Sequence, residues 1–259
     1  IVSGSGSKDK VSVYTRSGTS WSHQQTFTGG VSSSGVSQFG RNVGISEDTN
    51  YIIVGATQDD YNSVSNAGAA YIWKRSGSTW SQEAALYGSD RAANEQMGYG
   101  VALNSDATIA VAGARYASGG GAAYVYTRSG STWSQVQKLT GEHGPTWSGG
   151  GAGYVLSFGY RVHIPKGNDD LLLISAPKSH KPSPFVVGRG EVYVFEKTGT
   201  GASTYSYRTS LFSSIDLGSG SNETGEDLQS SNDGTFIIGG AHVLDFTADN
   251  AGGAYVWTV

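Results

Sequence analysis

The sequence predicts an all-β protein built from repeated units of four short antiparallel strands, and three observations lead to this prediction. An aromatic segment recurs almost unchanged, as GAAYIWKRSGSTWSQEAAL at 68–86 and GAAYVYTRSGSTWSQVQKL at 121–139. A hairpin that begins at a glycine and ends in Gly-Ala or a close relative also recurs. Glycine is abundant (39 residues) and proline rare (5), as in turn-rich β structure. A chain that repeats itself is read first as a repeat architecture.

The first two strands of each unit are predicted to form an inner hairpin. The distance from its first glycine to the residue before the closing alanine is 15, 15, 16 and 15 positions. Because strands near the centre of such an assembly crowd one another, we expect small residues at both ends of this hairpin. The four copies run from Gly40 to Gly55, Gly98 to Gly113, Gly159 to Ser175 and Gly225 to Gly240.

The third and fourth strands carry aromatic residues at a fixed spacing. Seven positions separate Tyr14 from Trp21, Trp73 from Trp80 and Tyr126 from Trp133, whereas an insertion lengthens the copy from Phe195 to Tyr205. Four-stranded units that recur every 53 to 69 residues predict the blades of a β-propeller. We expect these aromatic residues, with Trp257, to fill the space between blades, each burying about 150 to 250 Å².

The chain is predicted to be a single propeller domain or fragment with three whole and two partial blades. The blade units span about 1–30, 31–89, 90–141, 142–214 and 215–259. Because both end units contain a third strand, they cannot complete one another. We therefore expect a ring of six or seven blades with repeats outside this chain, which begins at Ile1 as part of a longer or processed polypeptide. A five-bladed ring with frayed end blades is the alternative.

Several short motifs mark the ends of the inner hairpins. They are Phe39-Gly40, Phe158-Gly159, Gly55-Ala56, Gly113-Ala114, Ala176-Pro177 and Gly240-Ala241. In their order and spacing, over essentially the whole chain, they resemble the FG-GAP repeat family, whose best-known members form the N-terminal propeller of integrin α subunits. The resemblance implies a propeller. Because such propellers occur in adhesion receptors, secreted or surface proteins and accessory domains of enzymes, it does not fix the function.

The same resemblance points to the turns between the first and second strands as places for calcium. Here these turns read SEDTN, NSDAT, PKGNDD and SSNDG, without three carboxylates at alternate positions. Calcium takes six to eight oxygens, so Asn168, Asp169 and Asp170, or Asn232 and Asp233, would form at most a poor site. Ordinary polar β-turns are the alternative. We predict no metal and no cofactor.

Composition and motifs argue against several functions. The net charge of -4 comes without charged blocks, which argues against nucleic acid as a partner. No apolar run approaches the roughly 18 residues of a membrane helix, and without cysteine there is no disulfide and no zinc-thiolate site. The five histidines form no metalloprotease motif, and no glycine-framed nucleophilic serine is present. We therefore expect the chain not to be an enzyme.

The long and variable loops of the predicted blades all leave on one face, and we expect binding there because such loops on a rigid scaffold usually carry specificity. Trp147 stands out, since the other five tryptophans occupy repeat positions. An alternative is that its indole packs back against a blade edge. The candidate binding residues of this long-loop face are Asp59, Asp60, Tyr61, Arg115, Tyr116, His143, Trp147, His180 and Phe185.

These patterns favour an extracellular or cell-surface propeller that mediates protein–protein interaction or adhesion, binding a protein partner or its own copies. A lectin-like propeller that binds a glycan is the first alternative, because aromatic and acidic side chains in shallow loops also suit sugars. A structural subunit of an extracellular filament is the second. Asn222 begins a glycosylation sequon, which supports secretion only for a eukaryotic protein.

Overall fold

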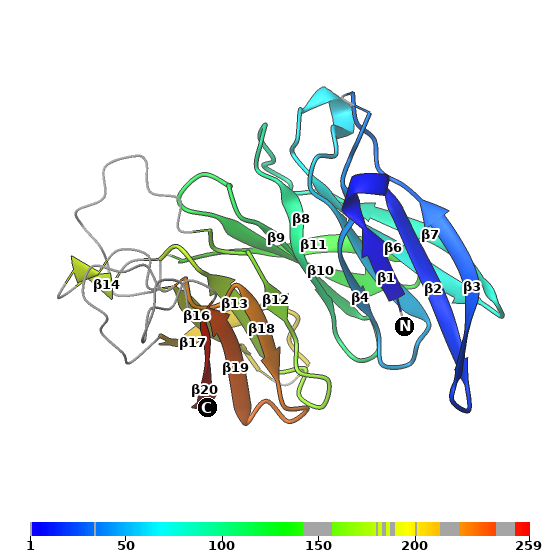
Figure 1. Cartoon of the computed structure of the whole chain (residues 1–259). Coiled ribbons are helices and arrows are strands. Elements are labelled where there is room, and N and C mark those ends of the chain that lie inside the picture. The colour runs from blue at the N-terminus through cyan, green and yellow to red at the C-terminus, as the bar shows by residue number, and fades with distance from the viewer. Residues whose placement is uncertain are drawn as a thin grey trace.

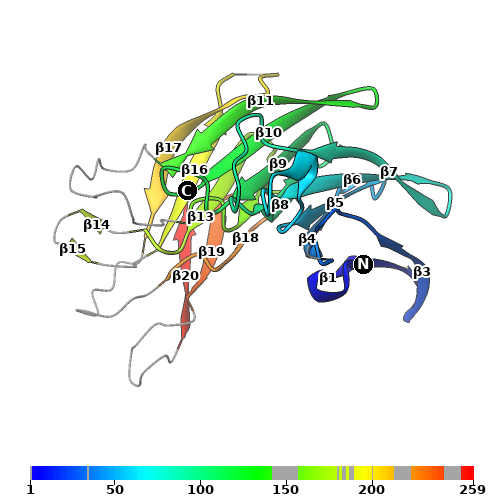
Figure 2. The ribbon, with the colours of Figure 1, turned by 90° about the horizontal axis from the view of Figure 1, so that it is seen from above.

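The protein is an all-β propeller of five antiparallel blades that follow one another in chain order along an arc (Figures 1 and 2). A small hairpin of β14 (Lys181–Pro182) and β15 (Phe185–Val186) is inserted in the fourth blade. The structure is a computed structural model. It describes residues 2–33, 35–141, 157–179, 181–182, 185–186, 190–199, 201–212, 223–241 and 252–259.

Three blades have four strands and the two end blades have three. The first blade lacks the strand that opens the others, and the last stops after its third strand, as the repeat pattern predicts. The first blade comprises β1 (Val2–Ser5), β2 (Lys10–Ser17) and β3 (Ser20–Thr28); the second β4 (Phe39–Ile45), β5 (Tyr51–Ala56), β6 (Ala69–Ser76) and β7 (Thr79–Leu86); the third β8 (Met97–Leu103), β9 (Ile109–Ala114), β10 (Ala122–Ser129) and β11 (Thr132–Thr140); the fourth β12 (Val162–His163), β13 (Leu171–Ala176), β16 (Glu191–Lys197) and β17 (Tyr205–Leu211); and the fifth β18 (Asp227–Ser230), β19 (Phe236–Ala241) and β20 (Gly253–Thr258). The predicted ring of six or seven blades is not confirmed.

Two 3-10 helices complete the described elements, η1 (Gly6–Lys8) after β1 and η2 (Tyr61–Ser63) between β5 and β6. Neither they nor any other helix in the described ranges is long and apolar enough to cross a membrane.

The nearly constant spacing of the inner hairpins has a physical cause in the contact between neighbouring blades. A Cβ added to Gly55 at the end of β5 would lie 1.9 Å from the carbonyl oxygen of Gly98 in the next blade. Gly113 meets Gly159 at the same distance one blade further on. The backbones of successive blades touch at these points, so the small residues that mark the repeat are required by packing.

The spaces between blades are filled by apolar side chains, as the aromatic spacing predicts. Phe27 stacks on Trp73 across the first interface, with ring centroids 4.0 Å apart, and Phe195 is fully buried in the third. Trp80, Tyr126 and Tyr205 are also buried. The prediction is wrong for the first blade, where Tyr14 and Trp21 are 36% and 48% exposed because no described blade covers their side. Trp133 and Trp257 are half-buried.

Candidate functional site

The first strands of the second and third blades are bulged immediately after their glycines. Pairing with the second strand jumps from Phe39 to Val43 in β4 and from Met97 to Val101 in β8. Gly40 and Gly98 adopt φ of 91° and 89°, values that favour glycine. Bulges commonly redirect side chains near functional sites. Here they take the next residues, Arg41 and Tyr99, out of the regular ladder.

The residues that follow the first glycine of four successive blades contact one another in a row. Arg41 Nη2 donates to Tyr99 Oη at 2.5 Å. The ring centroids of Tyr99 and Tyr160 are 4.7 Å apart, and their hydroxyls are hydrogen-bonded. Tyr160 Oη lies 3.5 Å from Glu226 Oε1. Side chains about 60 residues apart in sequence therefore meet at the inner ends of the blades, on the long-loop face.

Two more arginines complete what we call the inner cluster. The Cζ of Arg115 lies 3.9 Å from the Tyr99 ring centroid and 4.3 Å from that of Tyr116, within the range of cation–π attraction. The Cζ of Arg161 lies 5.1 Å from the Tyr160 ring centroid. The inner cluster consists of Arg41, Tyr99, Arg115, Tyr116, Tyr160, Arg161 and Glu226.

Positive charge in this cluster is only partly neutralised. Arg161 has a carboxylate 3.8 Å away in Asp227, but within the described ranges neither Arg41 nor Arg115 forms an ion pair. Arg115 Nε donates instead to the amide oxygen of Gln96 at 3.2 Å. A guanidinium presents several donors in a planar fork, so both arginines retain donors for a carboxylate or a phosphate.

Tyr99 lies at the centre of the cluster, with 4% of its surface exposed. Burial raises the pKa of its phenol, but hydrogen bonds from Tyr160 and Arg41 and the positive charge of Arg115 outweigh burial and bring the pKa below its usual value. The phenolate form of Tyr99 is therefore favoured more than in an ordinary tyrosine.

Among the residues predicted from the sequence, Arg115 and Tyr116 belong to the inner cluster. Asp59 and Asp60 do not reach it, because their carboxylates bind the connection that leads into β4. Asp59 Oδ2 accepts from the Val31 amide at 2.7 Å and from the Tyr71 hydroxyl at 2.6 Å. Asp60 Oδ2 accepts from the Ser33 amide at 2.6 Å. Both carboxylates hold loop structure together.

The remaining predicted residues lie elsewhere. Tyr61 stacks on Tyr87, with ring centroids 3.6 Å apart, and lines a groove between the second and third blades. Phe185 is in β15, and nothing of its side chain is described. His143, Trp147, His180 and Asn222 lie outside the described residues.

Sequence reasoning missed Arg41, Tyr99, Tyr160, Arg161 and Glu226. The signal that could have found most of them is variation inside the repeat. The glycine that precedes each is constant, whereas the next residue is in turn Arg41, Tyr99, Tyr160 and Glu226.

The turns discussed for calcium tie neighbouring blades together. Asp169 accepts hydrogen bonds from the Asn104 side chain at 3.1 Å and the Ser105 amide at 3.3 Å, while Asn168 donates to the Asp233 carbonyl at 3.0 Å. In the part of the chain that the structure describes, no three His, Cys, Asp or Glu residues are grouped so that they could hold a metal ion.

Comparison with known protein families identifies the repeat in two segments of the chain. Residues 21–73 and 80–126 match the FG-GAP repeat family. These two segments carry FG-GAP repeats. No curated protein matches it.

Solved structures similar to this chain are also propellers. A protein from Bacteroides fragilis described as a candidate 6-phosphogluconolactonase aligns with TM-score 0.58 and 11% identity, over 93% of this chain and 60% of its own length. A protein from Bacteroides uniformis with the same description aligns with TM-score 0.51 and 10% identity, over 93% of this chain and 62% of its own. This chain thus spans about three fifths of their length, and at this identity the likeness concerns the fold.

These structures correct the expectation that the chain is not an enzyme. Propellers of the same fold are described as candidate 6-phosphogluconolactonases. The expectation was wrong because it relied on the absence of a local catalytic motif. In this fold, a cluster of side chains is assembled from several blades, and no short motif reveals it.

Proposed function

We propose that the chain binds a small organic anion, carboxylated or phosphorylated, at the inner cluster. The observation that carries this proposal is the position of Arg41 and Arg115. Their Cζ atoms lie 4.7 Å and 3.9 Å from the Tyr99 ring centroid, and neither has a carboxylate partner among the described residues. Arginine forks match phosphate and carboxylate in a bidentate geometry. The Tyr99 ring packs against both guanidinium groups, so the two arginine side chains lose little conformational entropy when they bind a ligand.

The ligand to test first is a sugar acid or its lactone, because proteins of this fold are described as acting on a phosphorylated sugar lactone. In the proposed reaction, water attacks the lactone carbonyl carbon and gives its proton to the Tyr99 phenolate. The carbon–oxygen bond of the ring then breaks, and the leaving oxygen takes up that proton. A guanidinium beside the carbonyl would stabilise the negative charge that develops on its oxygen.

Binding is tested by titration calorimetry with 6-phosphogluconate, the product acid. We expect saturable binding that Arg115→Gln weakens at least tenfold and that weakens with added salt. Arg75→Gln is the matched control, because the Nε of Arg75 binds the Gly77 carbonyl in an exposed turn. Equal affinity for wild type and Arg115→Gln would reject the inner cluster as the site.

Catalysis is tested separately, by following acid release from 6-phosphogluconolactone with wild type and Tyr99→Phe. We expect the variant to keep its affinity for 6-phosphogluconate and to lose about a hundredfold in rate. Hydrolysis unaffected by the substitution would exclude Tyr99 as the base while leaving the binding proposal standing.

A second candidate is binding of a protein partner or of further copies of the chain, in the extracellular or cell-surface setting that we expected. Tyr116 favours it, since 41% of its surface is exposed and its ring lies against Arg115. Tyrosine and arginine are frequent in the centres of protein interfaces. Sedimentation equilibrium of wild type and of Tyr116→Ala tests whether the chain binds further copies of itself. We expect wild type to associate as its concentration rises and Tyr116→Ala not to associate. Wild type that stays monomeric at all concentrations would exclude self-association.

A further inference from the structure

At two of the interfaces a glutamine on the fourth strand of one blade bonds to the backbone of the next blade's fourth strand. Across the first, Gln25 Nε2 donates to the Trp80 carbonyl at 2.9 Å, and Gln25 Oε1 accepts from the Trp80 amide at 2.8 Å. Across the third, Gln137 makes the same pair of bonds with Tyr205, at 2.7 Å and 2.8 Å. In both cases a side-chain amide satisfies both backbone groups at the start of the next blade's fourth strand.

The second interface lacks this strand-to-strand link, although Gln135 on β11 bonds to Ser89 in the connection between the two blades. Ala84 occupies the position of Gln25 and Gln137, two residues before the apolar end of the fourth strand. Trp133 is the counterpart of Trp80, since each pairs with the arginine of its own hairpin turn. Among the described residues, no side chain hydrogen-bonds to the backbone of Trp133, and its ring is only half-buried whereas Trp80 is 3% exposed.

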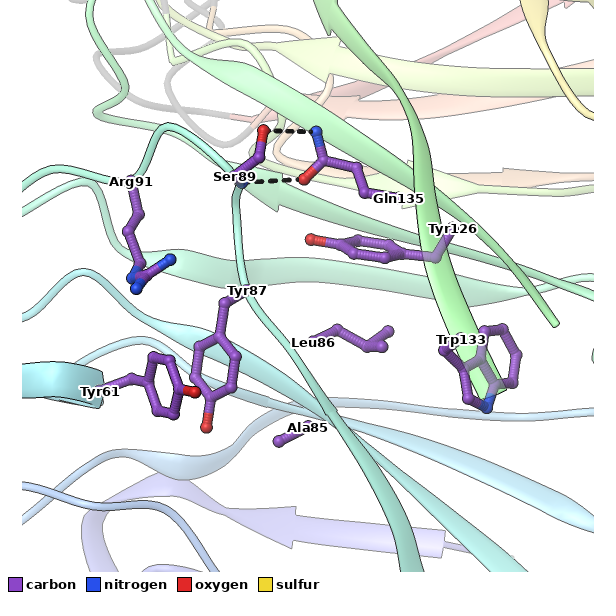
Figure 3. A pocket seen from close by; sticks show the side chains of 9 residues that line it. All are labelled: Tyr61, Ala85, Leu86, Tyr87, Ser89, Arg91, Tyr126, Trp133 and Gln135. Atoms are coloured by element: carbon purple, nitrogen blue, oxygen red, sulfur yellow. Dashed lines mark hydrogen bonds between the residues drawn. The ribbon is translucent and has the colours of Figure 1, made fainter. Parts of the chain in front are cut away.

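A groove of about 330 Å³ lies at this interface (Figure 3). Leu86 contributes to its floor, where the first interface has the larger Phe27 stacked on Trp73. Leu86 lines the groove, and Ala84, two residues before it, has a smaller side chain than the glutamine at the same position of the first and third interfaces. The lining residues are Tyr61, Ala85, Leu86, Tyr87, Ser89, Arg91, Tyr126, Trp133 and Gln135.

Polar groups with unused bonding capacity surround this groove. Among the described residues, the buried Nε of Arg91 has no hydrogen-bond partner. The hydrogen-bond partner of the Tyr126 hydroxyl in the described part of the chain is a methionine sulfur, Met97 Sδ at 3.9 Å, which is a weak acceptor. One face of the Tyr87 ring is covered by Tyr61, and its other face turns toward Leu86 and the groove (Figure 3).

We propose that this groove binds an N-acetylated sugar whose acetamido group takes the place of the missing glutamine. An acetamido group carries the same N–H donor and carbonyl acceptor, so it can pair with the C=O and N–H of Trp133. The apolar face of a pyranose ring suits the free face of Tyr87. Sugar hydroxyls can bond to the Arg91 guanidinium and to the Tyr126 hydroxyl. The site is separate from the inner cluster and does not depend on the proposed function.

A glutamine side chain of a partner peptide would offer the same amide. The sugar is favoured because the unused donor of Arg91 and the poorly partnered hydroxyl of Tyr126 require several hydroxyl groups around the amide, and a glutamine chain brings none.

The test is titration of the protein with N-acetylglucosamine, followed by saturation-transfer NMR and calorimetry. We expect saturable binding with the strongest transfer at the acetyl methyl group, and at least tenfold weaker binding of glucosamine, which lacks the acetyl group. Ala84→Gln should restore the internal link, fill the site and abolish binding while the melting temperature stays equal or rises. Gln25→Ala, at the first interface, is the control and should bind the sugar like wild type.

Three results would overturn the proposal: no binding of N-acetylglucosamine to wild type, equal binding to the Ala84→Gln variant, or equal affinity for glucosamine. Binding of N-acetylglutamine amide without binding of the sugar would assign the groove to a peptide and reject the sugar. The unchanged or raised melting temperature of Ala84→Gln ensures that a loss of binding is not a loss of fold.

Discussion

Gly113 at the end of β9 lies so close to Gly159 in the next blade that a Cβ on Gly113 would be 1.9 Å from the Gly159 carbonyl oxygen. Both partners in this contact are backbone, so neither can move without shifting a whole blade. We expect Gly113→Ala to destabilise the protein by about 3 kcal/mol or more, through overpacking. Thermal unfolding followed by circular dichroism measures this. Gly199→Ala is the control, since no atom lies within 4 Å of its added Cβ. Equal melting temperatures for both variants would refute the backbone contact.

The glutamine links predict a measurable contribution to the stability of the first interface. Gln25→Ala removes two partly buried hydrogen bonds and leaves the backbone N–H and C=O of Trp80 without a side-chain partner there. We expect a loss of about 2 kcal/mol. Denaturant unfolding measures it, with Gln229→Ala, an exposed glutamine on β18, as control. If the two variants unfold alike, the links contribute nothing to interface stability.

Glu191, the first residue of β16, predicts a pH dependence of stability. Burial raises the pKa of its carboxyl, hydrogen bonds with Ser210, Tyr193 and Ser179 lower it in part, and the net pKa lies above the usual value. One of its two carboxyl oxygens, Oε1, is buried and has no hydrogen-bond partner by distance and angle among the residues that the structure describes. Because the folded pKa exceeds the unfolded one, the stabilising contribution of the protonated form is complete below the unfolded pKa. It is lost as pH rises through the folded pKa.

Glu191→Gln should therefore match wild type near pH 4 and exceed it by on the order of 1 kcal/mol near pH 8, because the neutral amide avoids burying a charge. Melting temperatures across this pH range test the prediction. Glu196→Gln is the control, a half-exposed carboxyl on the same strand. A constant difference between wild type and Glu191→Gln at all pH values would contradict the argument.

Much of the fold could be predicted because it depends on local repetition. The constant spacing of glycines reports the contact between backbones, and the aromatic pairs report the filling of the interfaces. Trp21 was misplaced because its burial depends on a blade that no described residue provides. The spacing alone says nothing about which blades have neighbours.

The candidate site was predicted only in part, for a different reason. Arg115 follows a glycine–alanine step in a variable loop, which a search for loop residues detects. Arg41, Tyr99 and Tyr160 occupy a single variable position within each repeat, and only the arrangement of blades brings them together. Asp59 was predicted as a binding residue because it lies in a long variable loop. Its hydrogen bond to the Val31 amide joins residues 28 positions apart, which the sequence pattern does not reveal.

Asp59 provides the last prediction, because its carboxylate joins the connection before β4 to the loop after β5. Its pKa is raised by burial, although hydrogen bonds from Tyr71, Val31 and Tyr61 act in the opposite direction. Asp59→Ala leaves the Val31 amide and the Tyr71 hydroxyl without their acceptor, and we expect a loss of about 3 kcal/mol. Tyr71→Phe removes one of these bonds and should cost about 1 kcal/mol.

Hydrogen exchange at the Val31 amide should accelerate in Asp59→Ala and not in Tyr71→Phe. Since this connection leads directly to Arg41, Asp59→Ala should also weaken binding of 6-phosphogluconate. Unchanged exchange at Val31 would show that the connection is held by other contacts.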